Sequence, residues 1–74
     1  MKNDRSFTIE TEQEADGRWI AEVIELPGVL TYGGSAEQAR AKVEALAFRV
    51  LADELEASHS TSPSSFSNVS FSLI

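Results

Sequence analysis

The sequence predicts an α+β fold with the element order β-β-β-α-β: an antiparallel three-stranded meander, one helix on one face of the sheet, and a C-terminal fourth strand. Three observations predict this fold. Apolar and polar residues alternate in two early segments, which is the period of a half-buried strand. A long segment rich in Ala, Glu, Leu, Arg and Lys follows and favours a helix. Alternation then returns near the end of the chain.

The first three predicted strands cover Ser6–Glu12, Arg18–Glu25 and Val29–Tyr32. A turn at Gln13–Gly17 joins the first two, because an Asp-Gly pair favours hairpin turns in which glycine accepts a positive φ. The corner Leu26-Pro27-Gly28 ends the second strand, since proline has no amide to donate to a sheet. These segments therefore predict an antiparallel meander.

A helix is predicted from Ala36 to about Ala57. Ser35 suits its N-cap, and Gln38 three residues later completes a capping-box pattern. One apolar stripe is expected to lie on the sheet, and it comprises Ala39, Val43, Leu46, Ala47 and Val50. A second apolar line is turned away from the first and comprises Phe48, Leu51 and Leu55. We interpret this second line as a contact with a subunit or partner, the alternative being that a C-terminal segment wraps over it.

The C-terminal part contains a connection and a strand. Ser58–Ser67 is rich in serine, and Pro63 breaks any helix there. Asn68–Ile74 alternates again and predicts the fourth strand. If this strand returns beside the first, it runs parallel to it through a right-handed crossover. The serine-rich connection would equally permit it to join the sheet of a neighbouring subunit.

The chain of 74 residues carries a formal net charge of −6, and its acidic residues are concentrated in one segment. Only Arg18 offsets the carboxylates there, which belong to Glu10, Glu12, Glu14, Asp16, Glu22 and Glu25. Such a surface repels phosphate backbones, so direct nucleic-acid binding is not expected. It would attract a basic partner and speed the encounter. A solvated acidic face that maintains solubility is the alternative.

The length predicts one small domain, residues 1–74, with a thin core. Disulfides cannot stabilise it, because it has no cysteine. Small chains of this kind often gain stability by association, so we expect a homo-oligomer, a dimer or higher. No run approaches the roughly 20 apolar residues of a membrane span, and the first ten residues show no signal-peptide core. We therefore expect a soluble, cytoplasmic protein without membrane contact.

No arrangement typical of a catalytic site is found in the sequence. His59 lies among serines with no acid near it in sequence and no nucleophile elbow. Glu10, Glu12 and Glu14 share a strand face, but sites for hard cations usually draw their ligands from a turn that wraps the ion. The helix start Gly33–Ser35 could hold a small anion, although capping alone explains it. We expect no enzyme, no cofactor and no metal, and the anion site stays an open alternative.

A series of short motifs occurs in a fixed order between residues 5 and about 55. It comprises Asp16-Gly17-x-Trp19-x-Ala21-x-Val23-x-x-Leu26-Pro27-Gly28 and then Gly33-x-Ser35-x-Glu37-x-Ala39. The ordered set resembles the HicB-like antitoxin family, whose members typically show an aromatic residue after an acidic-Gly turn, a Leu-Pro-Gly corner and this kind of helix start. The chain departs from the family at Ile24, where proline is common, and at Gly34, where aspartate is common.

The resemblance implies a HicB-like fold, a truncated RNase H-like or dsRBD-like sheet without catalytic carboxylates. It also implies a partner, a small basic RNA-cleaving toxin of the HicA type, whose RNA-contacting surface the antitoxin would cover. Full-length family members usually carry a further helix-turn-helix or ribbon-helix-helix segment that binds operator DNA. The chain ends after one predicted strand, so DNA binding is not expected of it.

Two functions of different classes follow from these observations. The first is an antitoxin that binds and masks a basic HicA-type toxin through acidic and exposed apolar residues. The alternative is a stand-alone HicB-like oligomeric structural or binding protein without a toxin, which self-associates through the second apolar line of the helix. The candidate partner-binding residues are Glu10, Glu12, Ile20, Glu22, Ile24, Phe48, Leu51 and Leu55.

Overall fold

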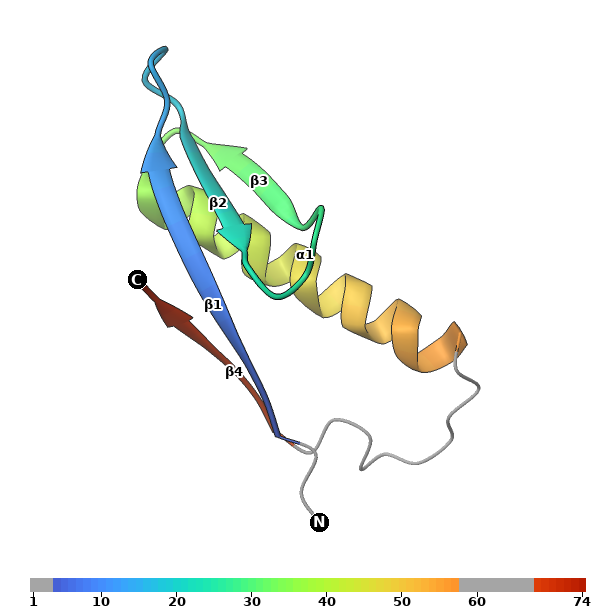
Figure 1. Ribbon diagram of the computed structural model, residues 1–74. Helices are drawn as coiled ribbons and strands as arrows, with labels where there is room; N and C mark the ends of the chain where they lie inside the picture. The colour runs from blue at the N-terminus through green and yellow to red at the C-terminus, as the bar shows by residue number, and fades with distance from the viewer. Residues whose placement is uncertain (1–3, 58–67) are drawn as a thin grey trace.

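The computed structural model of the protein describes residues 4–57 and 68–74, so the serine-rich connection and His59 lie outside the described residues. Five elements follow one another along the chain (Figure 1). They are β1 (Asp4–Gln13), β2 (Trp19–Val23), β3 (Leu30–Gly33), α1 (Ala36–Ala57) and β4 (Asn68–Leu73). The predicted α+β class and the order β-β-β-α-β are confirmed.

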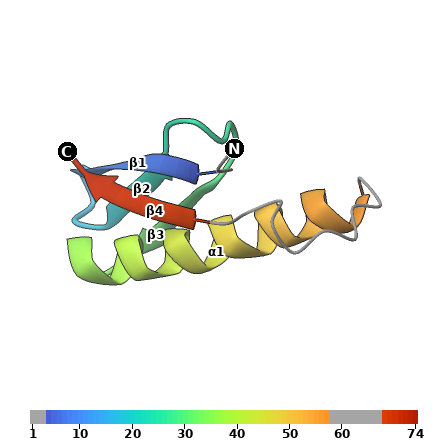
Figure 2. The same ribbon diagram turned by 90° about the horizontal axis from the view of Figure 1, so that it is seen from below.

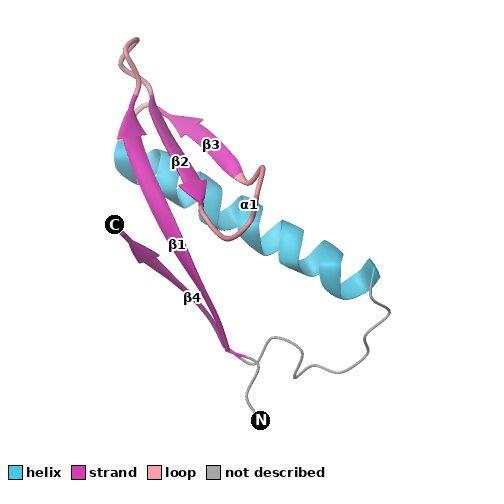
Figure 3. Ribbon diagram, in the orientation of Figure 1, coloured by secondary structure: helices cyan, strands magenta, loops and turns pink. Residues whose placement is uncertain are grey.

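The strands form one mixed sheet in the order β3-β2-β1-β4, and α1 lies across one face of it (Figures 1 and 2). β1 pairs with β2, and β2 pairs with β3, in antiparallel fashion, as expected for a meander. β4 runs parallel to β1 of the same chain, with Phe7 opposite Phe71. Of the two arrangements that the sequence left open for the fourth strand, the structure has the parallel return beside the first. The described residues form two layers, and among them no helix lies on the second face of the sheet (Figure 3).

The end of β2 differs from the predicted one because the chain turns early after this strand. Leu26 donates its N–H to the carbonyl of Val23 over 3.1 Å, and Val29 donates to Leu26 over 3.0 Å. The second of these turns places Pro27 before Gly28, whose φ of 86° is the left-handed conformation that glycine accepts. β2 therefore ends at Val23 and not at Glu25, and the Leu-Pro-Gly corner forms a tight turn.

The core lies between α1 and the sheet. Its buried apolar residues are Phe7, Ile9, Ala21, Val23, Val29, Ala39, Val43, Ala47 and Leu51. The helix contributes every fourth residue from Ala39 to Leu51, a row that is inclined to the helix axis. α1 accordingly crosses the strands obliquely (Figure 1). The predicted stripe shares Ala39, Val43 and Ala47 with this row, and its other members, Leu46 and Val50, are half-buried and pack against the core.

The helix start is built by the predicted cap. Ser35 Oγ accepts a hydrogen bond from the N–H of Gln38 over 3.1 Å, and the Gln38 side chain in turn accepts one from the N–H of Gly34. The second bond reaches one residue further back than in the usual capping box. Gly33 allows the helix to approach β3, because a Cβ there would lie 2.6 Å from the backbone nitrogen of Ala39.

Candidate partner-binding surface

The face of the sheet opposite α1 is exposed and carries both acidic and apolar side chains. Strand alternation directs one residue in two of each strand of the meander to this face. We call these residues the open face; they are Glu10, Glu12, Ile20, Glu22, Leu30 and Tyr32. Ile24 continues the pattern just beyond β2 and is 49% exposed. Figure 2 shows that α1 lies beneath the other face only.

Three carboxylates form the acidic part of the open face. Glu10 and Glu22 are direct partners in the antiparallel register, and Glu12 is two residues further along β1. Residues paired in this way have Cβ atoms only about 5 Å apart, and like charges there destabilise the sheet. The ion pairs of the described residues are Arg18–Asp16 and Arg40–Glu44, so these three glutamates take part in neither. A cation from outside would relieve their repulsion.

An apolar strip lies beside these carboxylates. Ile20 is paired with Tyr32, and Leu30 is paired with Glu22, so β2 and β3 place the two kinds of side chain side by side. Leu30 and Tyr32 are each 37% exposed. Protein interfaces commonly combine an apolar centre with polar groups around it. The open face thus combines exposed apolar side chains with carboxylates beside them.

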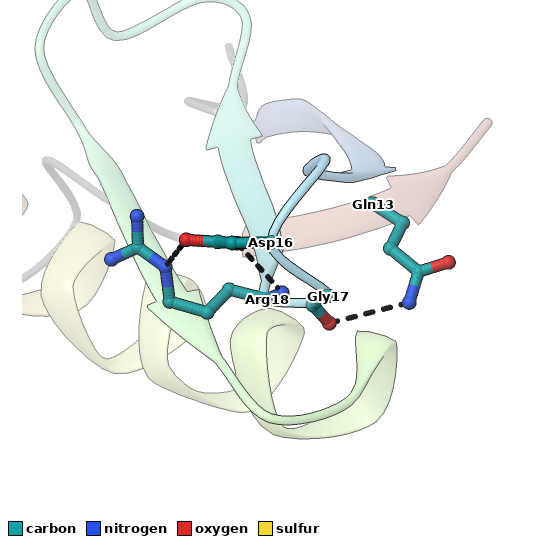
Figure 4. Close-up of polar contacts among 4 residues, drawn as sticks. All are labelled: Gln13, Asp16, Gly17 and Arg18. Carbon is teal, nitrogen blue, oxygen red and sulfur yellow. Dashed lines mark hydrogen bonds and ion pairs between the residues drawn. The ribbon is translucent and has the colours of Figure 1, made fainter.

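The nearby cation, Arg18, is engaged within the hairpin turn (Figure 4). Asp16 accepts hydrogen bonds from the Arg18 N–H over 3.0 Å and from its Nε over 2.8 Å. These bonds lower the pKa of Asp16, with the backbone N–H of Arg18 the largest cause. The guanidinium also lies 4.5 Å from the centre of the Tyr32 ring. Arg18 therefore forms its ion pair with Asp16 in the turn, while its guanidinium lies against Tyr32 of the open face.

Glu25 binds β1 just beyond the end of β2. Its two carboxylate oxygens accept hydrogen bonds of 2.7 Å from the N–H and the hydroxyl of Thr8. The backbone N–H of Thr8 is the largest cause of a lowered pKa at Glu25, followed by the Thr8 hydroxyl. The side chain thereby continues the contact between β1 and the chain that follows β2. Glu25 is not part of the unpaired acidic cluster.

The structure divides the eight candidate partner-binding residues between two surfaces. Five of them, Glu10, Glu12, Ile20, Glu22 and Ile24, lie on or beside the open face. Phe48 is 52% exposed on α1, and Leu55 is half-buried near the end of that helix.

The prediction for Leu51 is wrong, because this side chain is 4% exposed and belongs to the core. It completes the inclined row of the helix and cannot contact a partner. The ring of Phe48 meets Phe71 edge-on, with 5.4 Å between centroids. The C-terminal strand thus packs beside the second apolar line, as in the alternative interpretation.

Two residues of the open face were missed, Leu30 and Tyr32. The alternation of Val29–Tyr32 was the signal that placed them opposite the buried Val29.

Other kinds of site find little support in the described part of the chain. A hollow between α1 and β4 holds about 70 Å³, far below the roughly 300 Å³ at which small-molecule sites begin. No group of three potential metal ligands occurs among residues 4–57 and 68–74. At the helix start, the amides of Gly34 and Gln38 already have side-chain acceptors, so they are not free for an anion. None of the helices formed by these residues has the length and hydropathy needed to cross a bilayer.

Comparisons of the chain with protein-family models, with curated proteins and with solved structures found no match. Function must therefore be argued from the open face and from the ordered motifs of the sequence.

Proposed function

We propose that this chain is a binding module whose open face takes a small basic protein, and that it acts as a HicB-like antitoxin that masks a HicA-type mRNA-cleaving toxin in the cytoplasm. The observation that carries the proposal is the cluster of Glu10, Glu12 and Glu22, which has no ion pair with any described residue, beside exposed apolar residues. In this role the chain is no enzyme and needs no cofactor or metal.

The chemistry of the open face suits a competitor of RNA. A protein surface that binds RNA presents lysine and arginine side chains to phosphates. Three carboxylates on adjacent strands offer the same positive surface an alternative set of anionic partners. Long-range attraction speeds the encounter, whereas contact with Ile20, Leu30 and Tyr32 supplies the apolar burial that holds the complex. Binding by this face would exclude RNA from the toxin.

The ordered motifs support the HicB-like part of the proposal through the scaffold. Gly17 and Gly28 have φ values of 93° and 86° in the two turns of the meander. Gly33 permits the close approach of α1, and Ser35 caps it. These four motif residues therefore shape the backbone of the sheet and of the helix start. Partner choice rests on the side chains between them.

The proposal is tested by titrating the full chain with a small basic toxin of the HicA type, and by measuring inhibition of RNA cleavage. We expect binding that weakens as salt is raised, since screening shortens the range of the attraction. The double variant Glu10→Gln/Glu22→Gln should bind at least about tenfold more weakly, through loss of charge complementarity.

A matched control removes the same charge elsewhere. Glu54→Gln/Glu56→Gln changes two exposed residues at the far end of α1 and should leave the affinity within about twofold. Absence of any binding at low salt would contradict the proposal. Equal losses in the two double variants would show that net charge, and not the open face, is responsible.

A further inference from the structure

The outer edge of β4 presents backbone groups that no described residue pairs. Ile74 donates its N–H to the carbonyl of Ile9 over 3.2 Å, so the even-numbered residues of this strand face β1. By alternation, the N–H and C=O groups of Val69, Phe71 and Leu73 point away from β1. A row of this kind is a template on which another strand can pair.

The opposite edge of the sheet is protected, and the β4 edge is not. β3 is only four residues long, and Lys42 Nζ from α1 donates to the carbonyl of Tyr32 over 2.8 Å. β4 is six residues long, and its sequence NVSFSL contains no charged residue and no proline. Charges, prolines and short strands are the usual means by which edges avoid pairing. Only the β4 edge lacks all of them.

The core side of β4 is also incompletely covered. α1 packs mainly against β2 and β3 and less against β1, and in Figure 1 β4 lies to one side of it. The Phe48 ring of the helix contacts Phe71 of this strand, and Val69 and Phe71 pack against the edge of the core. As a result Phe71 is only half-buried, Phe48 is 52% exposed and Leu73 is 55% exposed. Phe71 and Leu73 thus form a partly exposed apolar seam along β4, and Phe48 lies beside Phe71.

We propose that a second copy of this chain pairs antiparallel with β4 about a twofold axis at Phe71, which gives one continuous eight-stranded sheet. In this register Phe71 faces Phe71 of the second copy, and Val69 faces Leu73 of the second copy. The Val69–Leu73 pair occurs twice because of the symmetry. All of these residues have backbone groups that point away from β1, so each pair can exchange hydrogen bonds. The apolar seams of the two copies then cover each other, and the two Phe48 rings lie beside them.

A second copy fits this edge better than a basic partner does. β4 carries no charge, and the charged residues beside the hollow near Leu73, Arg40 and Glu44, pair with each other over 3.8 Å. The acidic clusters of the two copies would be separated by β4 of each copy. Three strand spacings put one β1 about 14 Å from the other, which exceeds the screening length of about 8 Å at physiological salt. Their repulsion is therefore weak.

The proposed dimer does not depend on the antitoxin role. A twofold axis perpendicular to the sheet places both helices on one side and both open faces on the other. Each open face stays accessible, so a dimer would display two binding surfaces for the proposed partner. The pairing also gives a small chain with a thin core additional buried surface.

The test is sedimentation and light scattering of the full chain over a range of concentrations. We expect a reversible dimer in the wild type. Leu73→Lys, which places a charge against Val69 of the second copy, should weaken association at least about tenfold. Leu73→Pro should do the same, because it removes an outward N–H that makes no bond to β1. Leu30→Lys makes the matched change on β3 and should leave the dimer intact.

Hydrogen exchange provides a second readout that does not depend on any variant. In the dimer the amides of Val69, Phe71 and Leu73 should be protected, and protection should fall on dilution. A monomer at every concentration would overturn the proposal. So would a dimer in which these amides exchange freely, or one that Leu30→Lys dissociates while Leu73→Lys does not.

Discussion

Individual residues of the protein fall into those that shape the backbone and those that face solvent without a partner. Gly33, Ser35 and Glu25 belong to the first kind, since Gly33 leaves room for α1 beside β3, Ser35 caps α1 and Glu25 bonds to Thr8 at the end of β2. Glu10 and Glu22 belong to the second kind, because they face each other across two strands. Substitutions at the first kind should therefore alter stability, and substitutions at the second should alter binding.

Replacing Gly33 with alanine should lower the free energy of unfolding by about 1–3 kcal/mol. The added Cβ would lie 2.6 Å from the backbone nitrogen of Ala39, so α1 must move away from β3. Urea denaturation measures the change. Gly34→Ala is the control, because its Cβ would only approach the flexible end of Gln38, at 3.4 Å. Equal losses in both variants would argue against the close approach.

Glu25→Gln should reduce stability at neutral pH and lose its effect in acid. The hydrogen bonds from Thr8 lower the pKa of Glu25 below its ordinary value of 4.5. The stabilisation by the ionised carboxylate is therefore present above that value and is lost as the pH falls through the folded-state pKa. Melting temperatures of wild type and variant, measured from neutral pH downwards, should converge. A constant difference at all pH values would contradict this assignment, and the exposed Glu54→Gln controls for loss of one charge.

At the scale of elements, the helix illustrates which features the sequence could predict. The segment Ala36–Ala57 and its cap are confirmed because propensity and capping act locally. The buried face was predicted less well, since the crossing angle of α1 depends on the strands beneath it. The inclined row that starts at Ala39 brings Leu51 into the core, and no local signal reports that angle. β2 was predicted too long for a different reason, because two consecutive turns follow Val23.

Leu51→Ala should destabilise the protein by about 2 kcal/mol or more, as expected for a leucine in the core. Leu55→Ala makes the same chemical change at a half-buried position one turn later and should cost less. Thermal or urea unfolding of both variants gives the comparison. If the two losses were equal, Leu51 would lie outside the core, as the sequence alone had suggested.

At the scale of the whole molecule, one helix on a four-stranded sheet leaves two surfaces that no other described element covers. The open face carries an acidic cluster with an apolar strip, and the β4 side carries an uncharged seam. The sequence predicted the acidity and most of the open-face residues, because strand alternation is a local pattern. It could not predict that the β4 side is left uncovered, since this follows from where α1 rests on the sheet. The two surfaces suit different partners.

The most direct test of the central proposal maps the partner onto these surfaces. The ¹⁵N-labelled chain is titrated with the unlabelled basic toxin, and amide shifts are followed residue by residue. We expect the largest changes at Glu10, Glu22 and Tyr32 of the open face, with β4 little affected. Changes confined to β4 and the Phe48 side of α1, or no changes at low salt, would contradict the proposed role of the open face.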